Sequence, residues 1–369
     1  MRKVTFPHMG HSYIAFKMAM EEMGNEVIIP PRPGKETLDL GVKYAPEFAC
    51  LPYKVLLGTY LQTVAKGMDT IVTSGGVGPC RAGHYAHLHQ AILHNLGYNV
   101  NLICFEPPKR HPIDFYRKVQ SLNNAKLSIS SIIKLLKRGW HKLKALDHME
   151  KLSHQIRPRE LKRGTTSKVY LQAQRWLDEA RTHTEIKVAE AEGVKAFNDI
   201  PQDSERKVIK VGLVGEIYVL LEPASNLEIE ETLGHMGVEV ERSLFLTGWT
   251  VDNLQKNTEE LMTVTEAAQP YLPELIGGHG RDTIGHTVIY GKRKFDGVIQ
   301  IAPFTCIPEI VARTILPKVS KLHDIPVLTF FLDEQTGKAG MVTRLEAFVD
   351  LLKRKKQNIS ISQTATTLN

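Results

Sequence analysis

Short apolar runs alternate with helical patterns in two stretches of this chain, and this alternation constrains the fold more than any other feature. In the first stretch, the strand patterns lie at 3–6, 26–29, 69–74 and 98–104, with helical patterns at 12–22, 53–66 and 83–95. Strands that alternate with helices at this rhythm form a doubly wound parallel sheet. We therefore predict an N-terminal α/β domain of the Rossmann or flavodoxin type over residues 1–105.

The same rhythm returns in the second half of the chain. Strand patterns lie at 207–215, 238–240, 297–301 and 327–331, and helical patterns at 226–236, 252–268, 308–319 and 344–353. These elements predict a second doubly wound parallel-sheet domain over residues 206–356. The polar tail at 357–369 is predicted to be disordered.

Residues 106–205 break the rhythm, because leucines and isoleucines recur there at helical spacing among lysines and arginines. We predict a basic helical insertion or linker between the two domains. Residues 109–168 hold 16 Lys and Arg against 4 Asp and Glu, a net charge of +12, whereas the whole chain carries +7. A solvated helical face explains such a charge, and attraction for an acidic partner protein or a phosphate-bearing substrate is the alternative. No nucleic-acid-binding module accompanies it, so we expect no nucleic-acid partner.

Composition limits the class of protein. The chain has 42% hydrophobic and 24% charged residues, no apolar run long enough to span a bilayer, and no signal-peptide pattern at its N-terminus. We therefore expect a cytoplasmic protein without membrane association. Four cysteines in 369 residues do not resemble a disulfide framework, which favours reduced thiols or metal ligands.

Three of the four cysteines, Cys50, Cys80 and Cys306, stand where a helical pattern begins, each with a proline one or two residues away. Cys50 and Cys306 share the spacing Phe-x-Cys-x-Pro, which suggests two related halves that face one site. A helix N-terminus favours a thiolate. Gly75, Gly76 and Gly78 allow backbone N–H groups to approach the sulfurs. Three thiolates could hold three irons of a [4Fe-4S] cluster and leave the fourth iron open.

Other interpretations of the same residue types stay open. A lone cysteine is often a small buried hydrophobe, and Cys104 fits its strand as a core residue. His84 and His87 could share a helix face, yet these histidines, with His89 and His94, are also explained as surface or core residues. No Cys and His spacing marks a zinc site, and no Gly-Lys-Ser/Thr follows the glycine turn to make a phosphate loop.

Several longer strings resemble one family. They are FPHMG (6–10), YAPEFACLPYK (44–54), GGVGPCRAGHY (75–85), GEIYVLLEP (215–223), GHG (278–280), FDGVIQIAPFTCIPEIVA (295–312) and LDEQTGKAGMVTRLEAFVDLL (332–352). The chain resembles the 2-hydroxyacyl-CoA dehydratase and benzoyl-CoA reductase superfamily, within it the stand-alone branch labelled CoA protein activase or dehydratase-activator-related. The resemblance covers both α/β halves but not the basic helical segment.

The resemblance implies a [4Fe-4S] cluster on Cys50, Cys80 and Cys306, reduced by a separate ATP-hydrolysing activator, and low-potential one-electron chemistry on an acyl-CoA thioester under anaerobic conditions. By position, His279, Glu309 and the turn with Asp333 and Glu334 would line the same crevice, without assigned acid or base roles. Relatives work as pairs of related subunits, so a homodimer or a related subunit is a further expected partner.

Two hypotheses of different class follow. The first is a dehydratase or reductase component that binds acyl-CoA, a lyase or oxidoreductase type of enzyme. The second is an electron-transfer or accessory protein that docks the activator, through the basic segment at 109–168, and has no acyl-CoA turnover of its own. A third interpretation is a cluster-free α/β binding protein with buried thiols.

Overall fold

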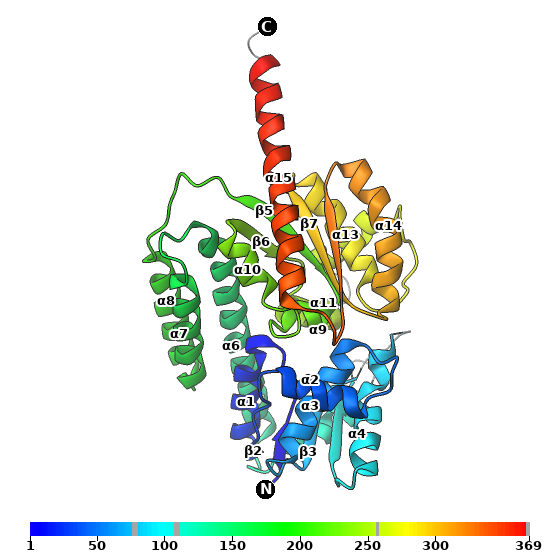
Figure 1. The fold of residues 1–369 in the computed structure, drawn as a ribbon. Helices are drawn as coiled ribbons and strands as arrows, with labels where there is room; N and C mark the ends of the chain where they lie inside the picture. The colour runs from blue at the N-terminus through cyan, green and yellow to red at the C-terminus, as the bar shows by residue number, and fades with distance from the viewer. Residues whose placement is uncertain (76–79, 107–110, 256–257, 367–369) are drawn as a thin grey trace. The chain divides into compact units, whose positions relative to one another are not determined.

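The computed structural model describes residues 1–75, 80–106, 111–255 and 258–366 (Figure 1). The chain divides into two compact units. The N-terminal unit comprises residues 1–150, 169–196 and 244–261, and the C-terminal unit comprises residues 151–168, 197–243 and 262–369. Each unit contains one sheet, and each is described by itself.

The N-terminal unit is built on a four-stranded, all-parallel sheet with the strand order β2-β1-β3-β4. Its strands are β1 (Lys3–Thr5), β2 (Glu26–Val27), β3 (Thr70–Ser74) and β4 (Asn101–Phe105). Its helices include α1 (Tyr13–Glu22), α2 (Lys35–Tyr44), α3 (Leu51–Val64), α4 (Tyr85–Asn95) and α5 (Pro112–Leu122). Neighbouring residues of β3 point to opposite faces, so Val72 packs with Met18 of α1 while Ile71 packs with Tyr60 of α3.

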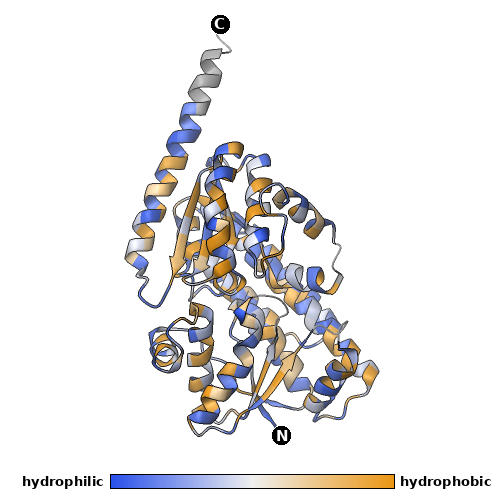
Figure 2. Ribbon diagram, turned by 90° about the vertical axis from the view of Figure 1, so that its right-hand side faces the viewer, coloured by the Kyte–Doolittle hydropathy of each residue, from blue (hydrophilic) through white to orange (hydrophobic). Residues whose placement is uncertain are grey.

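The C-terminal unit repeats this design with the strand order β6-β5-β7-β8, again all parallel. Its strands are β5 (Ile209–Gly215), β6 (Val238–Arg242), β7 (Gly297–Pro303) and β8 (Val327–Leu332). Its helices include α9 (Ile217–Leu221), α10 (Ile229–His235), α12 (Glu259–Ala268, shared with the N-terminal unit), α13 (Gly280–Lys292), α14 (Ile307–His323) and α15 (Lys338–Thr366). Every residue of β7 is buried, and hydrophobic (orange) stretches are visible in strands of this sheet in Figure 2.

Helices cover both faces of the C-terminal sheet. A side chain at Gly212 would collide with Tyr290 of α13, whereas a side chain at Gly297 would meet Leu352 of α15. Gly212 is paired with Val298, the neighbour of Gly297, so the two glycines point to opposite faces. Helices on both faces of two parallel sheets confirm the predicted two-domain, doubly wound α/β fold.

The predicted insertion is helical, as expected. It contains α5, α6 (Ile129–Ile156), α7 (Thr165–Glu179) and α8 (His183–Asn198). Its residues are divided between the two units, and α11 (Leu246–Gln255), from the second half of the sequence, belongs to the N-terminal unit.

Two local predictions were wrong. The single helix predicted at 252–268 is two helices, α11 and α12, because the Thr258 hydroxyl accepts a hydrogen bond from Leu261 N (3.1 Å) and starts a new helix. The tail predicted to be disordered continues α15 through Thr366. No glycine or proline follows Gly340, so nothing in the sequence stops this helix.

Candidate functional site

Three of the four cysteines immediately precede a helix, as predicted. Cys50 is the N-cap residue of α3, Cys306 is that of α14, and Cys80 precedes a short 3-10 turn (Arg81–His84) that leads into α4. Proline stands in the first turn of α3 and of α14, where its missing N–H group is not needed. All four cysteines are free thiols.

Cys50 and Cys80 come together within the N-terminal unit. The Arg81 guanidinium donates a hydrogen bond to the carbonyl oxygen of Phe48 (3.0 Å), which ties the second cysteine turn to the first. The Cys50 sulfur lies 2.8 Å from the Tyr85 hydroxyl. Burial is the largest cause that raises the pKa of Tyr85, and the thiols of Cys50 and Cys80 raise it further. Both sulfurs therefore lie near this one phenol. Residues 30 positions apart in the sequence therefore share one site.

The glycine turn between β3 and Cys80 is described only at its start. Gly75 donates its N–H to Phe105 O (2.8 Å). A Cβ at this position would lie 2.8 Å from the carboxyl carbon of Glu106 and 3.1 Å from the Cys104 sulfur, so a larger residue would displace the Glu106 side chain. Gly76 and Gly78, predicted to approach the cluster, lie outside the described residues.

Cys104, the three histidines of α4 and its N-cap residue His84 are core or surface residues, an interpretation that the sequence left open. Cys104 is buried in β4, and burial raises the pKa of its thiol, which keeps it protonated. His89 is buried, stacks on Tyr53 with ring centroids 4.2 Å apart, and contacts Tyr53 O at 3.0 Å. His84, His87 and His94 are exposed.

Cys306 lies at the carboxyl end of β7, in the C-terminal unit. The residue before it, Thr305, has a φ of 71°, which is a strained conformation for a β-branched residue. Such strain persists where the surrounding structure fixes the backbone, and here it sets the direction of the turn that carries Cys306. The flanking Phe304 and Ile307 are 59% and 62% exposed, as Phe48 beside Cys50 is 77% exposed.

Two predicted crevice residues, His279 and Glu309, lie close to each other, and Glu216 joins them. His279 is the N-cap residue of α13, Glu309 lies in the first turn of α14, and Glu216 is the N-cap residue of α9. Contact with Asp282 and the charges of Glu216 and Glu309 raise the pKa of His279 against the opposing effect of burial. Burial raises the pKa of Glu309 to about 7 and also raises the pKa of Glu216.

Sequence reasoning missed Glu216, although a signal was present. It follows β5 directly and starts α9, where its carboxylate accepts hydrogen bonds from Tyr218 N (3.0 Å) and Val219 N (3.1 Å). The other predicted pair, Asp333 and Glu334, lies in the turn after β8. The Asp333 carboxylate is engaged within that turn, accepting hydrogen bonds from Gln335 N (3.0 Å) and Thr336 Oγ1 (2.7 Å).

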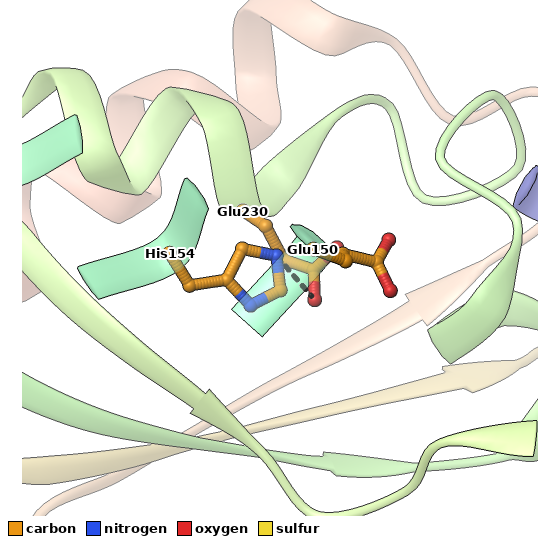
Figure 3. A group of neighbouring side chains, drawn as sticks. All are labelled: Glu150, His154 and Glu230. Atoms are coloured by element: carbon orange, nitrogen blue, oxygen red, sulfur yellow. Dashed lines mark ion pairs between the residues drawn. The ribbon is translucent and has the colours of Figure 1, made fainter. Parts of the chain in front are cut away.

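A separate buried group, Glu150, His154 and Glu230, could hold a metal ion (Figure 3). One ligand atom of each lies within 4.8 Å of the others. Glu150 and His154 are one turn apart on α6, a spacing visible in the sequence, but nothing in the sequence links them to Glu230. Glu230 also pairs with the buried guanidinium of Arg242 (3.1 Å) and lies 3.6 Å from His154. The guanidinium of Arg242 therefore already gives Glu230 a positively charged partner without a metal ion.

Basic side chains of the segment at 109–168 are partly used inside the protein. Arg138 pairs with Glu22, Lys118 with Asp114 (2.6 Å), and buried Lys142 donates to the carbonyl oxygen of Asp178 (3.3 Å). Lys134, Lys137 and Lys144 of α6 are exposed. The segment is therefore partly structural and partly a solvated basic face.

No protein-family model matches the chain, and no similar curated protein was found. The family resemblance therefore rests on the sequence motifs, and its implications are proposals. Within the part of the chain that the structure describes, none of the helices combines the length and the apolar character needed to cross a bilayer.

Proposed function

We propose that the chain is an iron-sulfur protein of the 2-hydroxyacyl-CoA dehydratase and benzoyl-CoA reductase type, with Cys50, Cys80 and Cys306 holding a [4Fe-4S] cluster. The observation that carries this proposal is the placement of all three thiols directly before a helix, with Cys50 and Cys80 gathered around Tyr85. Cys104, the one cysteine outside this pattern, is buried in a strand.

The donor set fits such a cluster. Iron-sulfur clusters are held by cysteine thiolates, and the positive end of a helix favours the thiolate form. The apolar side chains beside the thiols, Phe48, Phe304 and Ile307, are exposed although burial would stabilise them, which supports a role in keeping water from a bound group. When bound, the cluster would supply one-electron transfer at low potential and an open iron for a substrate oxygen.

Iron and acid-labile sulfide measured on protein purified without oxygen test this proposal. We expect about four irons per chain in the wild type. Cys50→Ala, Cys80→Ala and Cys306→Ala should each lose most of this iron. Cys104→Ala is the matched control and should retain it. Equal iron content in all four variants, or no iron after anaerobic reconstitution, would contradict the three-ligand assignment.

For the substrate we propose an acyl-CoA thioester, and for the electron donor an ATP-hydrolysing activator. The alternative, an electron-transfer protein that docks the activator, is favoured by one observation, the exposed basic and apolar residues Ile133, Lys134, Leu136 and Lys137 along α6. Isothermal titration of the iron-loaded protein with an acyl-CoA separates the two. Binding supports the enzyme component. Reduction by the activator without acyl-CoA binding, lost when Lys134 and Lys137 are changed to Glu, supports the docking protein.

A further inference from the structure

Glu309 occupies an unusual cage in the C-terminal unit. Its side chain is fully buried, and its carboxylate contacts two neutral side chains. The amide of Gln300 donates to Oε2 (2.9 Å), and the hydroxyl of Thr283 lies 3.1 Å from Oε1 and 3.0 Å from Oε2. Within the described residues, no lysine or arginine forms an ion pair with Glu309. A buried carboxylate without such a pair is costly to ionise.

The cage has room for a proton on one particular oxygen. Gln300 Nε2 also donates to the carbonyl oxygen of Glu309 (3.0 Å), so its orientation is fixed and Oε2 must accept. Gln300 Oε1 receives the hydroxyl of Thr329 (3.0 Å), which supports the same orientation. The Thr283 hydroxyl lies about equally far from Oε1 and Oε2 and can either donate or accept, so Oε1 is not committed to accepting as Oε2 is. Oε1 can therefore carry a proton and donate it to Thr283 without any change in position.

His279 begins the helix that packs beside Glu309, because a Cβ at Gly280 would lie 2.8 Å from the carbonyl carbon of Pro308. Its Nδ1 lies 3.3 Å from Asp282 Oδ2, and its side chain is 13% exposed. The charged groups that act on it are Asp282, Glu216 and Glu309. Those that act on Glu309 are His279, which favours the ionised form, and Glu216, which disfavours it. Burial raises the pKa of Glu309 to about 7, where small changes in these neighbours alter its proton occupancy.

The three elements that carry the groups begin at the same edge of the sheet. Glu216 directly follows β5, Glu309 lies six residues after β7, and His279 begins α13, which packs on β5 and β7. In doubly wound sheets this carboxyl edge is where ligands bind. The group of side chains is therefore placed where a proton could reach a bound molecule.

We propose that Glu309 and His279 form a proton-exchange site at the carboxyl edge of the C-terminal sheet. Glu309 takes up a proton on Oε1, held toward Thr283, and the partly exposed His279 transfers it between Glu309 and the edge of the sheet. The site goes beyond the proposed cluster and does not depend on iron.

Infrared spectroscopy on the full-length protein, with iron removed by a chelator, tests this proposal. The carbonyl stretch of a protonated carboxylic acid should disappear as the pH rises from about 5 to about 9, with a midpoint near the pKa of Glu309. Glu309→Gln should abolish this titrating band. Glu274→Gln, a change at an exposed glutamate, is the matched control and should leave it unchanged.

Two variants that keep Glu309 test its electrostatic coupling to His279 and Glu216, because they should shift the titration midpoint in opposite directions. His279→Asn removes a positive neighbour and should raise the midpoint by about 0.5–1 pH unit, whereas Glu216→Gln removes a negative neighbour and should lower it by a similar amount. A band that persists in Glu309→Gln, the absence of any titrating band in the wild type, or a midpoint unaffected by both neighbours would overturn the proposal. Because the protein in this experiment contains no iron, failure of the iron measurement leaves its outcome unaffected.

Discussion

Gly58→Ala should destabilise the N-terminal unit, because α2 and α3 cross at two glycines. A Cβ at position 58 would lie 2.8 Å from the carbonyl carbon of Thr37 and closer still to its oxygen. At the other end of the crossing, a Cβ at Gly41 would lie 2.6 Å from the carbonyl carbon of Lys54. Both obstacles are backbone atoms, which cannot rotate away as a side chain can.

Two opposing effects set the magnitude. Replacing a helical glycine by alanine stabilises a helix by about 0.5–1 kcal/mol. Overpacking costs about 1–3 kcal/mol, and a clash with backbone belongs at the upper end of that range. The net expectation is a loss of about 2 kcal/mol in the free energy of unfolding. Gly248→Ala in α11 is the matched control, because nothing lies within 4 Å of its Cβ position, and it should gain about 0.5–1 kcal/mol.

Urea unfolding followed by tryptophan fluorescence suits this comparison. All three tryptophans, at positions 140, 176 and 249, belong to the N-terminal unit, so their emission reports the unfolding of this unit. Both variants should retain the wild-type dependence on urea. Because α3 begins directly after Cys50, Gly58→Ala should also weaken iron retention by the protein. Equal stability of the Gly58→Ala and Gly248→Ala proteins would refute the close crossing of α2 and α3.

Two further predictions concern buried charges. Burial lowers the pKa of His89 from 6.5 to about 4. Between these pH values the unfolded chain binds more protons than the folded protein. The free energy of unfolding of the N-terminal unit should therefore fall by up to about 1.4 kcal/mol per pH unit as the pH drops from 6.5 toward 4. Urea unfolding at a series of pH values measures this slope, and His89→Gln, which keeps a donor for Tyr53 O, should flatten it. Arg242→Met removes the buried guanidinium that pairs with Glu230 and should cost the C-terminal unit about 3–5 kcal/mol by circular dichroism, whereas Arg242→Met with Glu230→Met should recover most of this loss.

The sequence predicted the features that depend on short-range patterns. Apolar runs such as 69–74 and 297–301 indicated the central strands, and Pro52 and Pro308 indicated that helices begin beside Cys50 and Cys306. The end of the chain was mispredicted because polarity was taken as disorder, although no residue there interrupts a helix. The group of Glu216, His279 and Glu309 was only partly predicted, since Glu216 lies 63 residues before His279 and only the folded sheet brings them together.

The relation between the two halves also changes once the topology is known. In the sequence, the shared Phe-x-Cys-x-Pro spacing suggested that Cys50 and Cys306 occupy equivalent positions in the two halves. The common strand order instead pairs Cys80 with Cys306, because each lies between the third strand of its unit and the helix that follows. Cys50, at the start of the helix before the third strand, then corresponds to His279 at the start of α13.

This correspondence gives the two units different chemistry on the same framework. At equivalent helix starts, the N-terminal unit has two thiols close to a phenol, whereas the C-terminal unit has one thiol, an imidazole and two carboxylates. Thiolates bind iron, and an imidazole beside a neutral carboxyl exchanges protons. His279→Cys would make the second unit resemble the first. It should remove the titration coupling of Glu309 and leave the iron content of the protein unchanged, because the proposed cluster has its three ligands elsewhere. A gain or loss of iron in this variant would show that His279 belongs to the cluster site rather than to a separate proton site.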